Sequence, residues 1–195
     1  MKVRYFATLA TLAVGVLMGV QAHATVLGFD DLDAKGKLAS IGANNPYGGL
    51  TWDKNWFLGV TTVGGYDNGA HSGSNFVNNG FSVKSVAVSS SAGFDFAGAW
   101  FAAPDINGTR ATSINISAYD AANQLIGTTG DVGITNSMAF VAARFDDVAR
   151  LVITRDKGFF VMDDFTLADT ALPEPGGLFA LGLGLVGWMG RRRAA

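Results

Sequence analysis

The sequence predicts an all-β fold, a single β-sandwich over residues 25–169. Three observations lead to this prediction. Polar and apolar residues alternate along short segments, which is the pattern of strands with one buried face. Segments rich in Asn, Gly and Ser separate these strands, and Asn-Gly pairs favour the positive φ angles of tight hairpin turns. No window in this part of the chain keeps the apolar 3.6-residue period of a helix over three turns.

Residues 111–119 carry the clearest strand pattern. Ile114 and Ile116 share one face and alternate with Asn115 and Ser117 on the other. Nine further strands are expected, at residues 26–32, 49–52, 56–60, 81–88, 94–101, 125–128, 138–142, 149–154 and 159–167. About ten short strands with frequent turns favour a β-sandwich of jelly-roll type.

The N-terminus has the layout of a secretory signal peptide over residues 1–24. Basic residues come first, an uncharged apolar segment follows over 6–20, and Ala22 and Ala24 form an A-x-A cleavage site. Cleavage after Ala24 would make Thr25 the first residue of an exported chain.

The C-terminal residues 170–195 form a second predicted targeting segment with three parts. These are a short motif of Pro173, Glu174, Pro175 and Gly176, an apolar helix over 177–190, and a basic tail of Arg191, Arg192 and Arg193. The uncharged stretch would span roughly 22 Å as a helix, somewhat less than a hydrocarbon core of about 30 Å. The arginines would remain in the cytoplasm and leave the body outside. The alternative is a buried amphipathic helix, which would not be apolar on every face.

This tail resembles the C-terminal sorting signal of PEP-CTERM proteins, the substrates of exosortases in Gram-negative bacteria. The resemblance implies an exosortase-like membrane protease as partner and transient insertion of the C-terminal helix into the inner membrane. It further implies cleavage near the Pro-Glu-Pro motif and release to the cell surface or the extracellular space, where exopolysaccharide is a second partner.

Three body motifs are similar to those of many PEP-CTERM proteins. They are Phe-Asp-Asp-Leu at 29–32, Tyr-Gly-Gly-Leu-Thr-Trp at 47–52 and Met-Asp-Asp-Phe at 162–165. The resemblance implies that strands with the first and last motifs open and close a jelly roll like that of carbohydrate-binding modules.

The charge of the body excludes one class of partner. Without Lys2, Arg4 and the three C-terminal arginines, 9 of the 14 basic residues remain against all 16 acidic ones, a formal charge of −7. An acidic body without a basic cluster argues against nucleic acid. The chain has no cysteine, so disulfides, thiolate zinc sites and cysteine nucleophiles are excluded.

No catalytic residue is assigned from the sequence. His71 is the only histidine after signal removal, Glu174 is the only glutamate, and no G-x-S-x-G motif precedes a helix. A hydrolase that uses two aspartates stays a less favoured alternative.

Two aspartates suggest a calcium site. Asp31 in the expected strand 26–32 and Asp163 in the expected strand 159–167 each share a face with large apolar residues. A buried carboxylate needs a partner or a metal, and calcium prefers oxygen ligands. If the first and last strands pair, both would bind one ion. The alternative is that a bulge or strand end turns them to solvent.

Four aromatic residues suggest a sugar-binding site. Tyr47, Trp52, Trp56 and Tyr66 lie within twenty residues of one another, among glycine-rich loops and short strands. Flat rings stack on the apolar faces of sugars, while Asn and Asp bond their hydroxyls. The alternative is that these rings fill the core of a cysteine-free domain.

The main functional prediction is an exported, non-enzymatic protein of the cell surface or extracellular matrix, processed by an exosortase-type system. The alternative is a carbohydrate-binding module that uses the aromatic cluster, and the third class is a hydrolase. No cofactor other than a structural calcium is expected.

Overall fold

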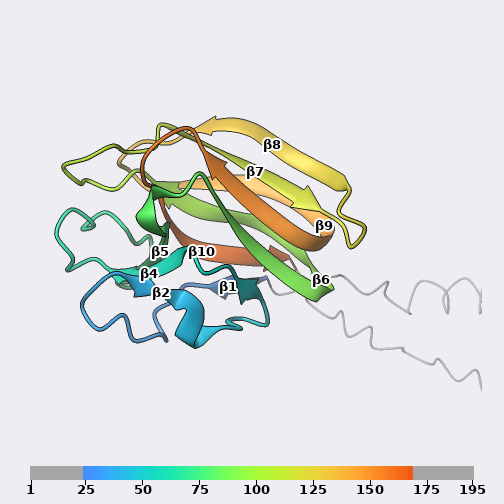
Figure 1. Cartoon of the computed structure of the whole chain (residues 1–195), viewed down its shortest axis with the longest axis horizontal. Coiled ribbons are helices and arrows are strands. Elements are labelled where there is room, and N and C mark those ends of the chain that lie inside the picture. The colour runs from blue at the N-terminus through green and yellow to red at the C-terminus, as the bar shows by residue number, and fades with distance from the viewer. Residues whose placement is uncertain (1–23, 169–195) are drawn as a thin grey trace, which may run out of the picture. The chain divides into compact units, whose positions relative to one another are not determined.

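The computed structural model describes residues 24–168 (Figure 1). The predicted signal peptide, C-terminal helix and sorting motif lie outside these residues. Within residues 24–168, no helix has the length and apolarity that a membrane crossing requires.

The described chain is all-β, as predicted. Its strands are β1 (Thr25–Leu27), β2 (Ala39–Ser40), β3 (Thr51–Trp52), β4 (Trp56–Val60), β5 (Asn75–Asn79), β6 (Ser85–Ala102), β7 (Ser113–Tyr119), β8 (Leu125–Gly133), β9 (Ala139–Arg155) and β10 (Val161–Ala168). Two 3-10 helices, η1 (Ile41–Asn44) and η2 (Gly80–Ser82), interrupt the series.

Two long strands replace four of the expected short ones. Segments 81–88 and 94–101 belong largely to one strand, β6, and segments 138–142 and 149–154 to another, β9. The β6–β9 register shifts between Ser89 and Gly98, so the pair bends at bulges without ending. The sequence signal of a bulge resembles that of a turn, which explains the wrong strand boundaries.

The strands form a β-sandwich in which β6 and β9 run through both layers. Their order is β2-β4-β5-β10-β6-β9-β7-β8, with β1 on β10 and β3 on β6. Each of these strand pairs is antiparallel. Figure 1 shows β7 and β8 in one layer and β2, β4, β5 and β10 in the other.

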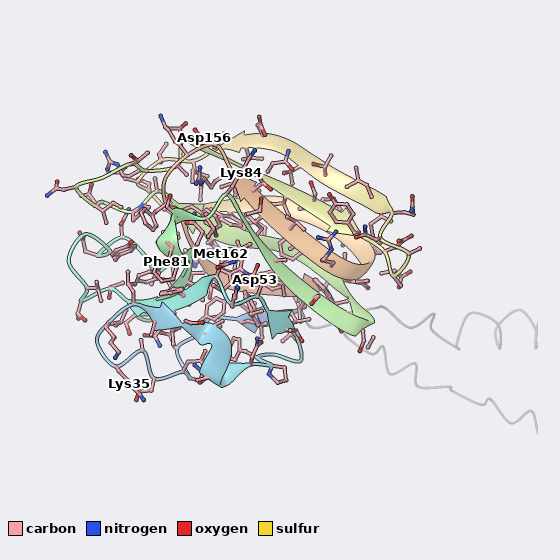
Figure 2. The ribbon with its side chains drawn as sticks, in the orientation of Figure 1. Lys35, Asp53, Phe81, Lys84, Asp156 and Met162 are labelled. Atoms are coloured by element: carbon pink, nitrogen blue, oxygen red, sulfur yellow. The ribbon has the colours of Figure 1, made fainter. Side chains whose placement is uncertain are left out.

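Aromatic side chains fill the space between the layers. Trp52 lies 5.3 Å from Phe29, 5.5 Å from Trp56 and 5.4 Å from Phe165, between ring centroids. Met162 of β10 is buried between the same layers (Figure 2). Each aromatic pair adds about 0.5–1.5 kcal/mol to the energy of burial, so this cluster stabilises a domain that has no disulfide.

A second apolar cluster lies on the outer face of the layer that contains β2, β4, β5 and β10. Tyr66, Phe76, Ala102 and Val161 are buried there. The covering loop 61–74 is held by Asn68, whose Nδ2 donates to the carbonyl oxygens of Ala103 and Asn136. This loop therefore places residues 71 and 72 beside β10 and β6.

Candidate functional site

The predicted sugar-binding cluster belongs mainly to the core. Trp52, Trp56 and Tyr66 are buried, and the indole N–H of Trp56 donates to the carbonyl oxygen of Ala87 at 2.9 Å. Tyr47 packs on Phe29 at 5.3 Å. The rings of Trp52, Trp56 and Tyr66 are enclosed and offer no face to a sugar, and only Tyr47 is partly exposed. The four residues therefore form no accessible sugar-binding cluster.

The predicted calcium site is not supported. Strands β1 and β10 do pair, with Thr25 opposite Leu167. However, β1 ends at Leu27, and Phe29 follows with a φ of 62°, so Asp31 lies in a turn. Its Oδ1 accepts the hydroxyl of Tyr47 at 2.8 Å. In the described part of the chain, no cluster of three or more acidic or histidine side chains is arranged to hold a metal.

Asp163 is buried and satisfied by the backbone. Its Oδ2 accepts the N–H groups of His71 at 2.8 Å and Ser72 at 2.9 Å, and its Oδ1 accepts that of Asp164 at 2.7 Å. Burial raises the pKa of Asp163 to about 6, although these hydrogen bonds lower it. The carboxylate therefore fastens the loop to β10 without a metal.

Two further aspartates fix the same loop. The Asp164 carboxylate lies 2.6 Å from Nδ1 of His71 and accepts the hydroxyl of Ser72 at 2.7 Å. Asp30 accepts the N–H of Ser74 at 2.7 Å. A Cβ on Gly73 would lie about 2 Å from the Asp30 carboxylate, so only glycine fits there. The Asp-Asp pairs are therefore loop anchors.

This cluster lacks the geometry of a catalytic triad. Ser72 Oγ donates to Asp164 and not to His71, whose Nδ1 is directed to the same carboxylate. A nucleophilic serine needs a hydrogen bond to the base that removes its proton. The arrangement orients the imidazole ring and does not activate the hydroxyl.

The oriented imidazole contributes to a partly exposed aromatic surface formed by His71, Trp100 and Phe140. The His71 ring stacks on Trp100 with centroids 3.5 Å apart and planes 11° apart. Phe140 meets Trp100 edge-on at 5.8 Å and is 42% exposed. The strand register brings these side chains together, because Trp100 of β6 lies opposite Asp163 of β10 on one side and opposite Phe140 of β9 on the other.

Sequence reasoning does not identify this surface, because Trp100 lies inside the apolar segment 94–101, where every large residue resembles a core residue. The alternation around it was the available signal. Ala99 and Phe101 are fully buried in the core between the layers, whereas Trp100 is only partly buried. A period of two therefore places Trp100 on the opposite face of β6.

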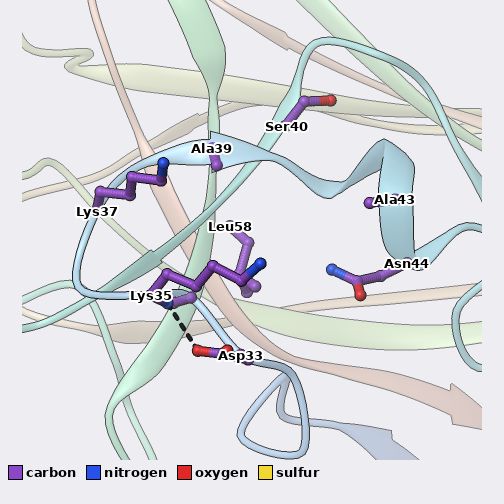
Figure 3. Close-up of a pocket in the computed structure, with 9 residues that line it drawn as sticks. Asp33, Lys35, Lys37, Ala39, Ser40, Ala43, Asn44 and Leu58 are labelled. Atoms are coloured by element: carbon purple, nitrogen blue, oxygen red, sulfur yellow. Dashed lines mark hydrogen bonds between the residues drawn. The ribbon is translucent and has the colours of Figure 1, made fainter.

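A pocket of about 420 Å³ lies near β2 and η1 (Figure 3). Lys35, Lys37 and Asn44 are among the residues that line it. In this pocket, the backbone N–H of Lys35 donates a hydrogen bond to Oδ1 of Asp33 at 2.9 Å. The pocket offers ammonium groups but no aromatic lining residue, so it lacks the stacking element that sugar recognition favours.

No protein-family model and no curated protein matches this sequence. Several solved structures are similar to it. A family 61 carbohydrate-binding module, TmCBM61 in complex with β-1,4-galactotriose, is 17% identical with a TM-score of 0.42, covering 73% of this chain and 94% of that one. The CBM22-1 xylan-binding domain of Paenibacillus barcinonensis Xyn10C is 10% identical with a TM-score of 0.41, covering 70% and 97%. The K2 cleaved adhesin domain of Lys-gingipain is 14% identical with a TM-score of 0.42, covering 75% and 98%.

The similar structures include carbohydrate-binding modules of families 22, 51 and 61. None of these structures supports the main functional prediction, an exported matrix protein defined by exosortase processing. Similarity at this level locates no ligand site on the present chain, so any site has to be derived from its own residues.

Proposed function

We propose that this chain is a non-catalytic carbohydrate-binding module of jelly-roll type, which holds a polysaccharide on the aromatic surface of His71, Trp100 and Phe140. One observation carries the proposal. The ring of Phe140 is 42% exposed and is held edge-on against Trp100, on the outer face of the sheet. Phe140 therefore offers a solvent-exposed ring in a fixed position, whereas the rings of Trp52 and Trp56 are buried.

The surface combines the two elements of sugar recognition. The aromatic rings offer apolar faces to the C–H groups of a pyranose. His71, Ser72 and Asp164 place polar atoms beside them, and the imidazole Nε2 has no hydrogen-bond partner within residues 24–168. These groups suit sugar hydroxyls, which both donate and accept hydrogen bonds.

Binding at this surface would require little reordering. Three backbone N–H groups are bonded to Asp163, and the His71 ring is held by both Asp164 and Trp100. A site whose side chains are already ordered loses less conformational entropy on association. This rigidity supports recognition of a polysaccharide, which must itself lose freedom.

The acidic residues favour binding over cleavage. Two-carboxylate hydrolysis requires an acid and a base on opposite sides of the scissile bond. Asp163 is completely buried and occupied by backbone N–H groups, so it is not available to a substrate. Asp164 would then have no second carboxylate with which to carry out two-carboxylate hydrolysis.

We also infer that the module is exported. Thr25, the first residue after the predicted cleavage site, already pairs with Leu167 at the start of β1. Removal of residues 1–24 would therefore leave the strand intact. The resemblance of residues 173–193 to a sorting signal remains a prediction outside the described residues.

The proposal is tested by affinity electrophoresis and calorimetry on residues 25–168, with galactan, xylan, cellulose and polygalacturonate as probes. Phe140→Ala should weaken binding of the preferred polysaccharide about tenfold. Leu125→Ala, which truncates an exposed side chain on β8, is the matched control and should bind normally. Equal binding by both variants, or no binding by the unaltered domain, would reject the proposal.

A further inference from the structure

Phe81 is displayed to solvent from a strained turn. It lies in η2 with φ 55° and ψ 21°, and Ser82 follows with a φ of 51°. Bulky residues with a Cβ rarely adopt this left-handed region, because Cβ approaches the backbone carbonyl. The side chain is also 81% exposed, more than any other large hydrophobic residue within 24–168 (Figure 2).

The surrounding chain holds this turn in place. Ser82 Oγ donates to the carbonyl oxygen of Gly158 at 2.8 Å, and Arg155 donates to that of Ser82 at 2.5 Å. Asn79 Nδ2 donates to the carbonyl oxygens of Val83 and Gly158, both at 3.0 Å. The unfavourable backbone angles therefore persist because several independent hydrogen bonds impose them.

The ring itself is restrained by a single aromatic partner. Phe81 meets Phe57 edge-on, with centroids 4.9 Å apart and an interplanar angle of 79°. Phe57 lies directly against the backbone at Gly80, where a Cβ would come within 2.1 Å of its ring. Phe57 thus acts as a fixed support for Phe81, which keeps most of its surface in water.

The fold gains little from this arrangement. An exposed phenylalanine contributes little to the core, and a residue without a large ring would fit the turn as well. Strain at a well-determined position is typical of residues that contact a ligand. Such a ring is already ordered, so a ligand that stacks on it does not have to immobilise it.

Phe81 lies on the same side of the sheet as the aromatic surface. Phe57 of β4 points away from the core residues Trp56 and Leu58, and Trp100 and Phe140 also lie on this outer side. From β4, the order β5, β10, β6 leads to β9, which carries Phe140. Four steps of about 4.8 Å put Phe57 and Phe140 roughly 19 Å apart across the strands. Loop 61–74 covers Ala102 and Val161 between them, so a ligand that reaches both rings passes over this loop.

We propose that Phe81 is a second sugar-stacking contact, which makes the ligand an extended polysaccharide chain long enough to pass from Phe140 over loop 61–74 to Phe81. This inference rests on the proposed function. Simultaneous contact at both ends raises affinity for long chains, because the second contact forms at a high effective concentration. Short oligosaccharides reach only one of the two rings.

The test measures affinity for oligosaccharides of increasing length from the preferred polysaccharide. Phe81→Asn is the informative variant, because asparagine tolerates the left-handed region and removes the ring. It should weaken binding of the longest chains about three- to tenfold, leave trisaccharide binding unchanged, and not lower Tm. Leu125→Asn removes a side chain that is 56% exposed at a distant position and is the control.

The outcomes separate this inference from the function on which it rests. If the unaltered domain binds no saccharide of any length, the proposed function fails. If it binds and Phe140→Ala abolishes that binding, while Phe81→Asn matches the control at every length, only the second contact is rejected. A fall in Tm with equal losses at all lengths would also reject it, since Phe81 would then serve the fold.

Discussion

The Asp163 carboxylate holds the backbone of His71, which is 92 residues distant in sequence, through an N–H···Oδ2 hydrogen bond of 2.8 Å. The bond joins β10 to the loop that crosses its outer face. Because His71 in turn stacks on Trp100, the position of the aromatic surface depends on a buried acid that is not itself part of that surface.

Replacement of this acid should loosen the loop. Asp163→Asn leaves one oxygen and introduces an N–H₂ donor beside groups that are themselves donors. We expect a loss of about 1–3 kcal/mol in the free energy of unfolding, measured by urea denaturation at pH 7. Asp67→Asn, at an exposed position in the same loop, is the control. Equal stability of the two variants would contradict the anchoring role.

The cost of the same substitution should depend on pH. The pKa of Asp163 is raised from 3.8 to about 6 in the folded state, so the folded state binds its proton more tightly than the unfolded state. The stabilising effect of this proton is complete below about pH 3.8 and is lost as pH rises toward 6. The deficit of Asp163→Asn should therefore grow by about 1–3 kcal/mol between pH 7 and pH 4. A deficit that shrinks at low pH would show that the pKa is lowered.

Core and surface aromatics should respond in opposite ways. Trp52→Phe leaves a void beside Phe29 and Phe165 and should cost about 1–3 kcal/mol of stability, with saccharide affinity unchanged. Phe140→Ala should reduce affinity and change stability by less than about 1 kcal/mol. Thermal melting and calorimetry on both variants check this. Loss of affinity in Trp52→Phe at a temperature where it is folded would restore Trp52 as a binding residue.

Two adjacent asparagines of β5 should also differ. Asn78 is buried, and its Nδ2 has no hydrogen-bond partner in the described part of the chain. Asn79 is equally buried, but its Oδ1 accepts the N–H of Phe160 at 2.9 Å and its Nδ2 is bonded as well. Asn78→Leu should be neutral or stabilising by about 1 kcal/mol, whereas Asn79→Leu should cost about 2–4 kcal/mol. Equal losses in denaturation experiments would indicate a partner for Asn78.

Export predicts a defined N-terminus. After expression of the full chain in a secreting bacterium, intact-mass and N-terminal sequence measurements should find Thr25 as the first residue. Ala24→Leu, which removes a small residue from the cleavage site, should impair processing. Exported protein that still carries residues 1–24 would contradict signal-peptide removal.

The sequence alone was sufficient to predict the fold class. Alternation places Ile114 and Ile116 inward in β7, because a strand directs successive side chains to opposite faces. The pairing of β1 with β10, which the calcium hypothesis took as its condition, is also present. Strand boundaries failed in β6 and β9, because a bulge and a turn use the same small and polar residues.

The candidate site was decided by tertiary structure. Residues 71, 100, 140 and 164 come from four separate segments, and only the β10-β6-β9 order brings three of those segments into one row. The alternation of residues along a strand shows which side chains share a face. It does not show which of the two faces a distant loop will cover. The sequence therefore determined that Trp52 and Trp100 are large apolar residues in strands. Only packing decided that Trp52 is enclosed between two layers while Trp100 lies under a single imidazole ring, beside an exposed Phe140.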